Sequence, residues 1–131
     1  MKFQNMSAPL VIWMALLLVA CGGVGHVYNH WSYMSPLAEQ HMLMERFTAP
    51  VTVLRLLTPL KMSYEAAKKR AEPYTKIVGE LPEMRRETVE LVRKALAENR
   101  RAYVLVNNRS EGNAPLTIQA LNEQLRAPQH D

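Results

Sequence analysis

One candidate for chemistry in this sequence of 131 residues is an arginine inside an apolar segment. Arg55 interrupts Val51–Thr58, whose β-branched residues between Pro50 and Pro59 predict a strand. Because an unpaired guanidinium is costly to bury, Arg55 must either reach a partner or point to a rim. Two interpretations remain open from the sequence: an anion-binding side chain at a strand end, or a structural ion pair.

Further polar groups lie at the ends of two other predicted strands. His30 is in the short β-prone segment His26–Trp31, and it is either a proton carrier or a hydrogen-bonded structural histidine. Asn107 and Asn108 follow the apolar segment Ala102–Val106, where they offer amide donors and acceptors or simply form a turn. The remaining candidates in these two regions are Asn29, Arg109 and Glu111, the last of which also suits a first-turn helix charge.

The composition excludes several kinds of site. Cys21 is the only cysteine, so the sequence allows no internal disulfide and no thiolate metal cage. The four histidines lack paired ligand spacing, and neither a metal nor a cofactor is predicted. The 16 lysines and arginines against 12 acidic residues give a net charge of +4. These cations form short runs beside glutamates, without interleaved aromatic residues, so nucleic acid is not an expected partner.

Strands and helices are expected to alternate along the chain. The strands are the three segments named above, and the continuous apolar run Ala102–Val106 predicts a strand buried on both faces. Strand followed by helix three times implies an α/β fold of parallel strands joined by right-handed crossovers. Four helices are expected: Pro36–Phe47, a helix capped by Ser63 and ended by Pro73, a helix that begins at Pro82, and a last helix opened by Asn113 and Pro115. The helix from Pro82 is amphipathic, and its residues Arg85, Arg86 and Glu87 are expected in solvated positions.

The first 23 residues support two interpretations. Leu10–Ala20 is uncharged and apolar, has the length of a signal-peptide core, and is preceded only by the charge of Lys2. It is too short to cross a bilayer unaided. Its end, Leu18–Cys21, resembles the lipobox of bacterial lipoproteins. That resemblance implies that Cys21 is acylated and that the protein is a small membrane-anchored lipoprotein of structural or interaction type, facing the periplasm.

The other interpretation is a buried helix of a cytoplasmic α/β protein, closed by Gly22 and Gly23. Only about four residues separate Cys21 from the first predicted strand, a short reach for an extended chain. An acylated Cys21 would therefore hold that strand almost against the lipid headgroups, which favours the buried helix. The order of the charged and apolar regions favours export instead.

The segment Tyr103–Asn108, with Glu111-Gly112 and Ala114-Pro115, resembles the YecE-like family, a TIM-barrel domain of unknown function (number seventy-two). The resemblance covers residues 24–125 and extends to His30-Trp31 with Met34 and to Thr52–Thr58 around Arg55. The chain then divides into a hydrophobic N-terminal segment (1–23), a partial YecE-like domain (24–127) and a tail (128–131).

The resemblance implies the last three strand-helix units of a TIM barrel, and so a truncated barrel. Three parallel strands cannot close a barrel, so a second chain that completes the sheet is an expected partner. TIM-barrel sites lie at the carboxyl ends of the strands, which implies a polar face there that binds phosphate or another small anion. A membrane partner would act through Cys21 or residues 10–20, and no reaction follows from the resemblance. The implied face collects Asn29, His30, Arg55, Asn107, Asn108, Arg109 and Glu111.

Overall fold

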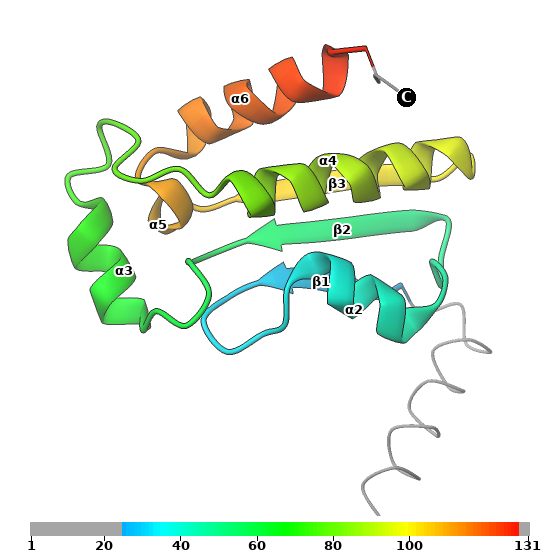
Figure 1. The fold of residues 1–131 in the computed structure, drawn as a ribbon, viewed down its shortest axis with the longest axis horizontal. Helices are drawn as coiled ribbons and strands as arrows, with labels where there is room; N and C mark the ends of the chain where they lie inside the picture. Colours follow the sequence, from blue (N-terminus) through cyan, green and yellow to red (C-terminus); the bar gives the residue numbers. More distant parts are fainter. Residues whose placement is uncertain (1–24, 129–131) are drawn as a thin grey trace, which may run out of the picture.

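Residues 25–128 are the part of the chain that the computed structural model describes, and they form an α/β fold of three strands and five helices (Figure 1). The predicted alternation of strands and helices is confirmed. The strands are β1 (Val27–His30), β2 (Val51–Leu56) and β3 (Arg101–Val106). The helices are α2 (Leu37–Met44), α3 (Tyr64–Ala71), α4 (Pro82–Ala97), α5 (Asn108–Glu111) and α6 (Ala114–Arg126).

The strands form one parallel sheet in the order β1-β2-β3. In the register, Val27 lies beside Val53 and Val53 beside Tyr103. The arrowheads in Figure 1 point toward α3 and α5, which contact each other at the carboxyl ends of the strands. Helix α2 packs against β1, and α4 and α6 pack against β3. These three helices form a single layer, and we call the side of the sheet beneath it the covered face.

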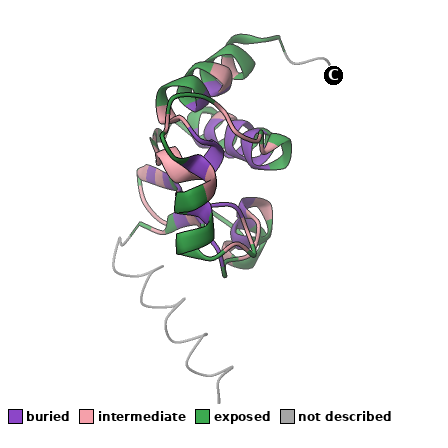
Figure 2. Cartoon of the chain, turned by 90° about the vertical axis from the view of Figure 1, so that its left-hand side faces the viewer, coloured by how far each residue is buried: buried purple, intermediate pink, exposed green. Residues whose placement is uncertain are grey.

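The core lies between the covered face and the helical layer. Tyr28, Leu54 and Leu56 point into it from the strands and are almost completely buried. Figure 2 shows the same separation, because buried residues lie toward the middle of the molecule while the outer side of α6, the uppermost helix, is exposed. The helices contribute the rest of the buried apolar cluster: Leu37, Met84, Val89, Leu91, Val92, Ala95 and Leu121.

Local signals explain where the helices begin. The Ser63 side chain accepts a hydrogen bond from the Ala66 amide, and the Asn113 side chain accepts one from the Leu116 amide, so both predicted caps are confirmed. The four-residue α5 was not predicted. It ends at Gly112, whose φ of +117° favours glycine, and a Cβ there would clash with the Lys76 carbonyl oxygen.

The prediction that Ala102–Val106 is buried on both faces is wrong. Tyr103 is 50% exposed and Leu105 is 54% exposed, whereas Val104 and Val106 pack against the core. The reason is that the helical layer covers one face of the sheet only. A continuous apolar run therefore does not distinguish a strand covered on both faces from one whose second apolar face is left open.

The predicted exposure of two charged residues of α4 is also wrong. Glu87 and Arg85 were expected in solvated positions, but both side chains are buried. The Glu87 carboxylate accepts a hydrogen bond of 2.9 Å from the Leu37 amide and so joins α4 to the start of α2. The i−3 and i+4 neighbours of Glu87 are Met84 and Leu91, both buried, and this helical spacing was the sequence signal that it faces inward.

The interpretations of Leu10–Ala20 and Cys21 fall outside the described residues. Within residues 25–128, no helix is both long enough and apolar enough to cross a membrane.

Candidate functional site

The second face of the sheet has no helix over it among residues 25–128, and we call it the uncovered face. Its side chains alternate with those of the covered face and form rows across the strands. One row is apolar and consists of Val27, Val53 and Tyr103. The next row toward the carboxyl ends consists of Asn29, Arg55 and Leu105. The register therefore brings two of the predicted site residues together, beside an apolar surface.

Arg55 is exposed and is oriented by Asn29. Its Nη1 donates a hydrogen bond of 3.3 Å to Asn29 Oδ1. Asn29 Nδ2 in turn donates to the Val27 carbonyl oxygen at 2.9 Å, which turns the amide oxygen toward the guanidinium. No carboxylate of the described residues forms a salt bridge with Arg55. Of the two interpretations left open by the sequence, this geometry favours the anion-binding side chain.

His30 lies on the covered face, away from Arg55. It is 4% exposed, and its Nδ1 donates a hydrogen bond of 3.0 Å to the Thr58 carbonyl oxygen. Burial lowers the pKa of His30, and the hydrogen bond to Thr58 partly offsets that effect. The arrangement is that of a neutral, hydrogen-bonded structural histidine.

Asn107 and Asn108 shape the loop after β3. The Asn107 side chain accepts a hydrogen bond of 3.0 Å from the Arg109 amide and caps α5. Asn108 Oδ1 accepts one of 2.8 Å from the Ala114 amide, at the start of α6. Both side-chain oxygens are thus engaged by the backbone, as in a turn.

Arg109 contacts helix α3. The carbon atom of its guanidinium lies 4.4 Å from the centre of the Tyr64 ring, within the range of a cation–π interaction. Its Nε is buried and has no hydrogen-bond partner among the described residues. Arg109 therefore links α5 to α3, in agreement with the contact between these helices, and it does not share the row of Arg55.

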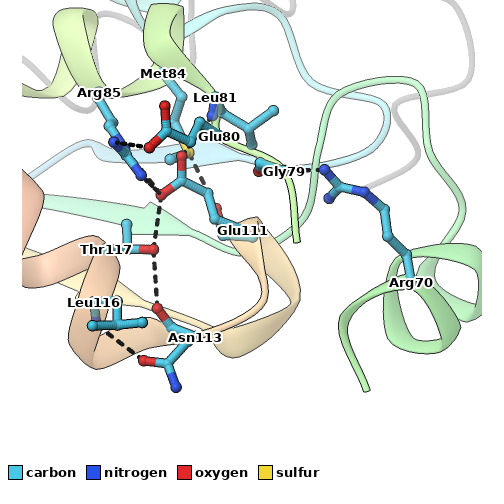
Figure 3. A network of polar contacts seen from close by, with 11 residues as sticks. Arg70, Gly79, Glu80, Leu81, Met84, Arg85, Glu111, Asn113, Leu116 and Thr117 are labelled. Atoms are coloured by element: carbon cyan, nitrogen blue, oxygen red, sulfur yellow. Dashed lines mark hydrogen bonds and ion pairs between the residues drawn. The ribbon is translucent and has the colours of Figure 1, made fainter. Parts of the chain in front are cut away.

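Glu111 is the centre of a buried polar network (Figure 3). Its side chain is fully buried, and Oε2 accepts hydrogen bonds from Arg85 Nη2 at 2.9 Å, from Arg85 Nε at 3.1 Å and from Thr117 Oγ1 at 2.8 Å. Its Oε1 accepts a bond of 2.6 Å from the Leu81 amide, at the start of α4. The carboxylate thus holds α4, α5 and α6 together and leaves no atom for a ligand.

Sequence reasoning missed Arg85 as the partner of Glu111. The basic pair Arg85-Arg86 was expected to be solvated, and only Arg86 is exposed, where it pairs with Glu83 and Glu90. Arg85 is three residues before Thr88 and seven before Val92, two buried positions on the same side of α4. That spacing was the available signal that Arg85 faces inward.

No family model, no curated protein and no solved structure matches the chain. Residues 25–128 contain no group of three or more histidine, cysteine, aspartate or glutamate residues arranged to hold a metal ion. Cys21, the lipidation candidate, lies outside these residues.

Proposed function

We propose that this protein binds a small anion on the uncovered face of its sheet, with Arg55 as the main contacting side chain. The observation that supports this proposal is an exposed guanidinium that is oriented by an amide oxygen at 3.3 Å and has no carboxylate partner among the described residues. A guanidinium is planar, carries five N–H donors and suits the oxygens of phosphates and carboxylates. Leu105, beside Arg55 in the register, adds an apolar wall that limits hydration of the ion.

The fold supports the same proposal. Sequential parallel strands with helices on one face only are the arrangement of a (β/α) barrel, whereas a doubly wound sheet has helices on both faces. We therefore propose that residues 25–128 are part of a barrel resembling the YecE-like family. The uncovered face would then be the barrel interior, and Arg55 would lie near the carboxyl ends of its strands. A second chain that completes the sheet would pair with the outer edges of β1 and β3.

The proposed activity is binding, without a reaction. His30 is the candidate proton carrier among the predicted site residues, and it points into the helical layer while Arg55 points to the opposite side. A proton carrier such as His30 and an anion-binding residue such as Arg55 cannot act on the same ligand atom when they lie on opposite faces of one sheet.

The test is calorimetric titration of the full chain with inorganic phosphate. Arg55→Ala is expected to weaken binding by about tenfold or more, because it removes charge-assisted hydrogen bonds. Arg55→Lys is expected to weaken it less, since it keeps the charge and loses the planar fork. Arg126→Ala is the matched control, an exposed arginine on α6 whose loss should not change the affinity.

Three results would contradict the proposal. Equal phosphate affinity in the wild type and in Arg55→Ala would remove Arg55 from the site. A loss of affinity in Arg109→Ala but not in Arg55→Ala would place the anion beside Tyr64, between α3 and α5, instead of on the sheet. Unchanged affinity in both variants would remove the anion site altogether.

A further inference from the structure

We propose that the outer edge of β3 binds an extended segment of a different protein chain, which joins the sheet as a fourth strand beneath helix α6. This segment would be the contribution of the second chain that completes the proposed barrel, and its binding does not depend on the anion at Arg55. Three features of residues 25–128 support it: free backbone groups along the edge, an apolar groove beside them, and a charge at one end.

The outer edge of β3 has backbone groups with no partner among the described residues. The amides of Arg101 and Asn107 donate to carbonyl oxygens at or beside the two ends of β2, at 3.0 Å and 2.8 Å, so these residues face β2. Successive residues of a strand point their backbone groups to opposite sides. Ala102, Val104 and Val106 therefore point theirs away from β2, where no strand of residues 25–128 lies. Such a row of free N–H and C=O groups is the pattern to which an extended peptide adds.

The opposite edge of the sheet, that of β1, is already engaged. The Gln40 side chain accepts a hydrogen bond of 3.1 Å from the Asn29 amide and donates one of 2.8 Å to the Asn29 carbonyl oxygen. The Asn29 side chain donates to the Val27 carbonyl oxygen at 2.9 Å. A partner strand would have to displace Gln40 to pair with β1, whereas it displaces no hydrogen bond at β3. The first strand to join the sheet is therefore added at β3.

An apolar groove lies beside β3 and under α6. It has a volume of about 210 Å³ and is lined by Val104 of β3, Thr88 of α4, and Ile118, Leu121, Asn122 and Leu125 of α6. Figure 1 shows α6 on the side of β3 that faces away from β2, so this helix covers the space in which a fourth strand would lie. An apolar cavity of about 150 Å³ holds a benzene molecule, so the groove accommodates an apolar side chain of the added strand. That side chain would cover Ile118, which is 50% exposed.

The position of α6 distinguishes a single strand from a second copy of this chain. Pairing of β3 with the β3 of a second copy is two-fold symmetric and would bring both copies of α6 over the gap between the two strands. Neighbouring strands lie about 4.8 Å apart, whereas packed helices need about 8–10 Å between their axes. The two helices would therefore overlap. A segment that carries no helix of its own at this place fits beneath α6.

The side chains along β3 define the chemistry of this segment. The groove beside Val104 requires an apolar residue at every second position of the added strand. Leu105, which is 54% exposed on the uncovered face, favours β-branched residues at the positions between them. Arg101, at the amino end of β3, is exposed and forms no salt bridge within residues 25–128. An acidic residue at the end of the segment that lies beside Arg101 is therefore favoured.

The test is titration of the full chain with a synthetic, blocked peptide of alternating valine and threonine that has a glutamate at each end and a fluorescent label. Ala102→Pro removes a free N–H group from the edge and should weaken binding by about tenfold. Ile118→Glu places a carboxylate in the groove and should weaken binding by about tenfold or more. Leu43→Glu is the matched control: Leu43 is 66% exposed on α2, which packs against β1, and its change should leave the peptide affinity unaltered.

Two N-methylated forms of the peptide distinguish strand pairing from a general apolar contact. Alternate residues of an added strand point their N–H groups toward β3, and the residues between them point theirs away. N-methylation of the threonines alone and of the valines alone should therefore have unequal effects, with one form losing binding by about tenfold or more relative to the other.

Three results would overturn the strand site. Unchanged peptide affinity in Ala102→Pro and Ile118→Glu would remove β3 and the groove from it. Equal effects of the two N-methylations would mean that the peptide does not pair as a strand. A dimer of the wild type that Ile118→Glu dissociates would assign the edge to a second copy. If Ala102→Pro loses its far-ultraviolet circular dichroism, Ile118→Glu decides alone.

Failure of the strand site and failure of the anion site give different results. Phosphate affinity in Ile118→Glu should equal that of the wild type, because Ile118 lies on the covered side of the sheet and Arg55 on the uncovered face. Loss of peptide binding with intact phosphate binding therefore concerns the edge of β3 alone.

Discussion

An arginine is buried with a carboxylate in the helical layer, whereas an arginine on the uncovered face of the sheet is exposed beside an amide. Arg85 donates two hydrogen bonds to the fully buried Glu111, which two further donors saturate. Arg55 has one contact of 3.3 Å, to Asn29. Both pairs join residues 26 positions apart in the chain. A charge that the fold neutralises serves stability, and a charge that it orients without neutralising is available to a ligand.

The largest expected effect comes from breaking the buried pair. Glu111→Ala leaves the Arg85 guanidinium buried without a carboxylate and frees the Leu81 amide, so we expect the free energy of unfolding to fall by about 3–5 kcal/mol. Urea unfolding of the full chain measures it. The control is Glu90→Ala, which removes an exposed partner of Arg86 from the same helix and should cause no measurable change. A loss in Glu111→Ala no larger than that in Glu90→Ala would mean that the buried network adds nothing to stability.

A change of pH is expected to have a smaller effect on stability, and this effect comes from histidines on the covered face and in the helical layer. Burial lowers the pKa of His30 and of His41, and for His41 the charge of Lys94 acts in the same direction while Glu98 opposes it. The folded state then binds fewer protons than the unfolded state below the ordinary histidine pKa of about 6.5. The free energy of unfolding should therefore be highest above that pH. It should fall as the pH drops below about 6.5 toward the lowered pKa values of the folded state.

Thermal unfolding between pH 7.5 and 5.5 tests this dependence. His41 has an Nε2 that is buried without a partner among the described residues, so its protonation is particularly unfavourable. His41→Gln should therefore flatten the dependence on pH, and His30→Gln should flatten it further. A melting temperature that rises as the pH falls would contradict the prediction.

Because Asn107 caps α5, replacing it should lower stability modestly and leave phosphate affinity unchanged. Asn107→Ala removes the hydrogen bond to the Arg109 amide and should cost about 1 kcal/mol, as for other helix caps. Phosphate affinity should stay at the wild-type value, because Asn107 is engaged by the backbone. Asn107→Asp, which keeps the capping oxygen, should restore stability. A lower phosphate affinity in Asn107→Ala with unchanged stability would assign this residue to the anion site.

The smallest expected change in stability is that of Arg55→Ala. Its guanidinium is exposed and has a single amide contact, so the free energy of unfolding should change by about 0.5 kcal/mol or less. The same variant should show the largest loss of phosphate affinity. The opposite pattern, a large loss of stability with intact binding, would make Arg55 a structural residue like Arg85.

The sequence predicted most of the elements, and the misses have separate causes. Strand segments, the Ser63 and Asn113 caps and the amphipathic pattern of α4 depend on residues a few positions apart, so they are legible in the chain. Helix α5 was missed because its four residues are too few to show a period. Arg85 was missed because its neighbour Arg86 carries the same charge, and only the position on the helix distinguishes them.

By itself, the sequence determined the order of strands and helices and the class of fold, since alternating apolar runs and amphipathic segments require only local spacing. The tertiary structure decided which face of the sheet is covered, because that depends on where α2, α4 and α6 pack. It also decided the partners of Glu111 and Arg55, since contacts across 26 residues follow from the sheet register and the packing of helices, which no local pattern specifies. The same register separated His30 from Arg55, because neighbouring residues of a strand point to opposite faces.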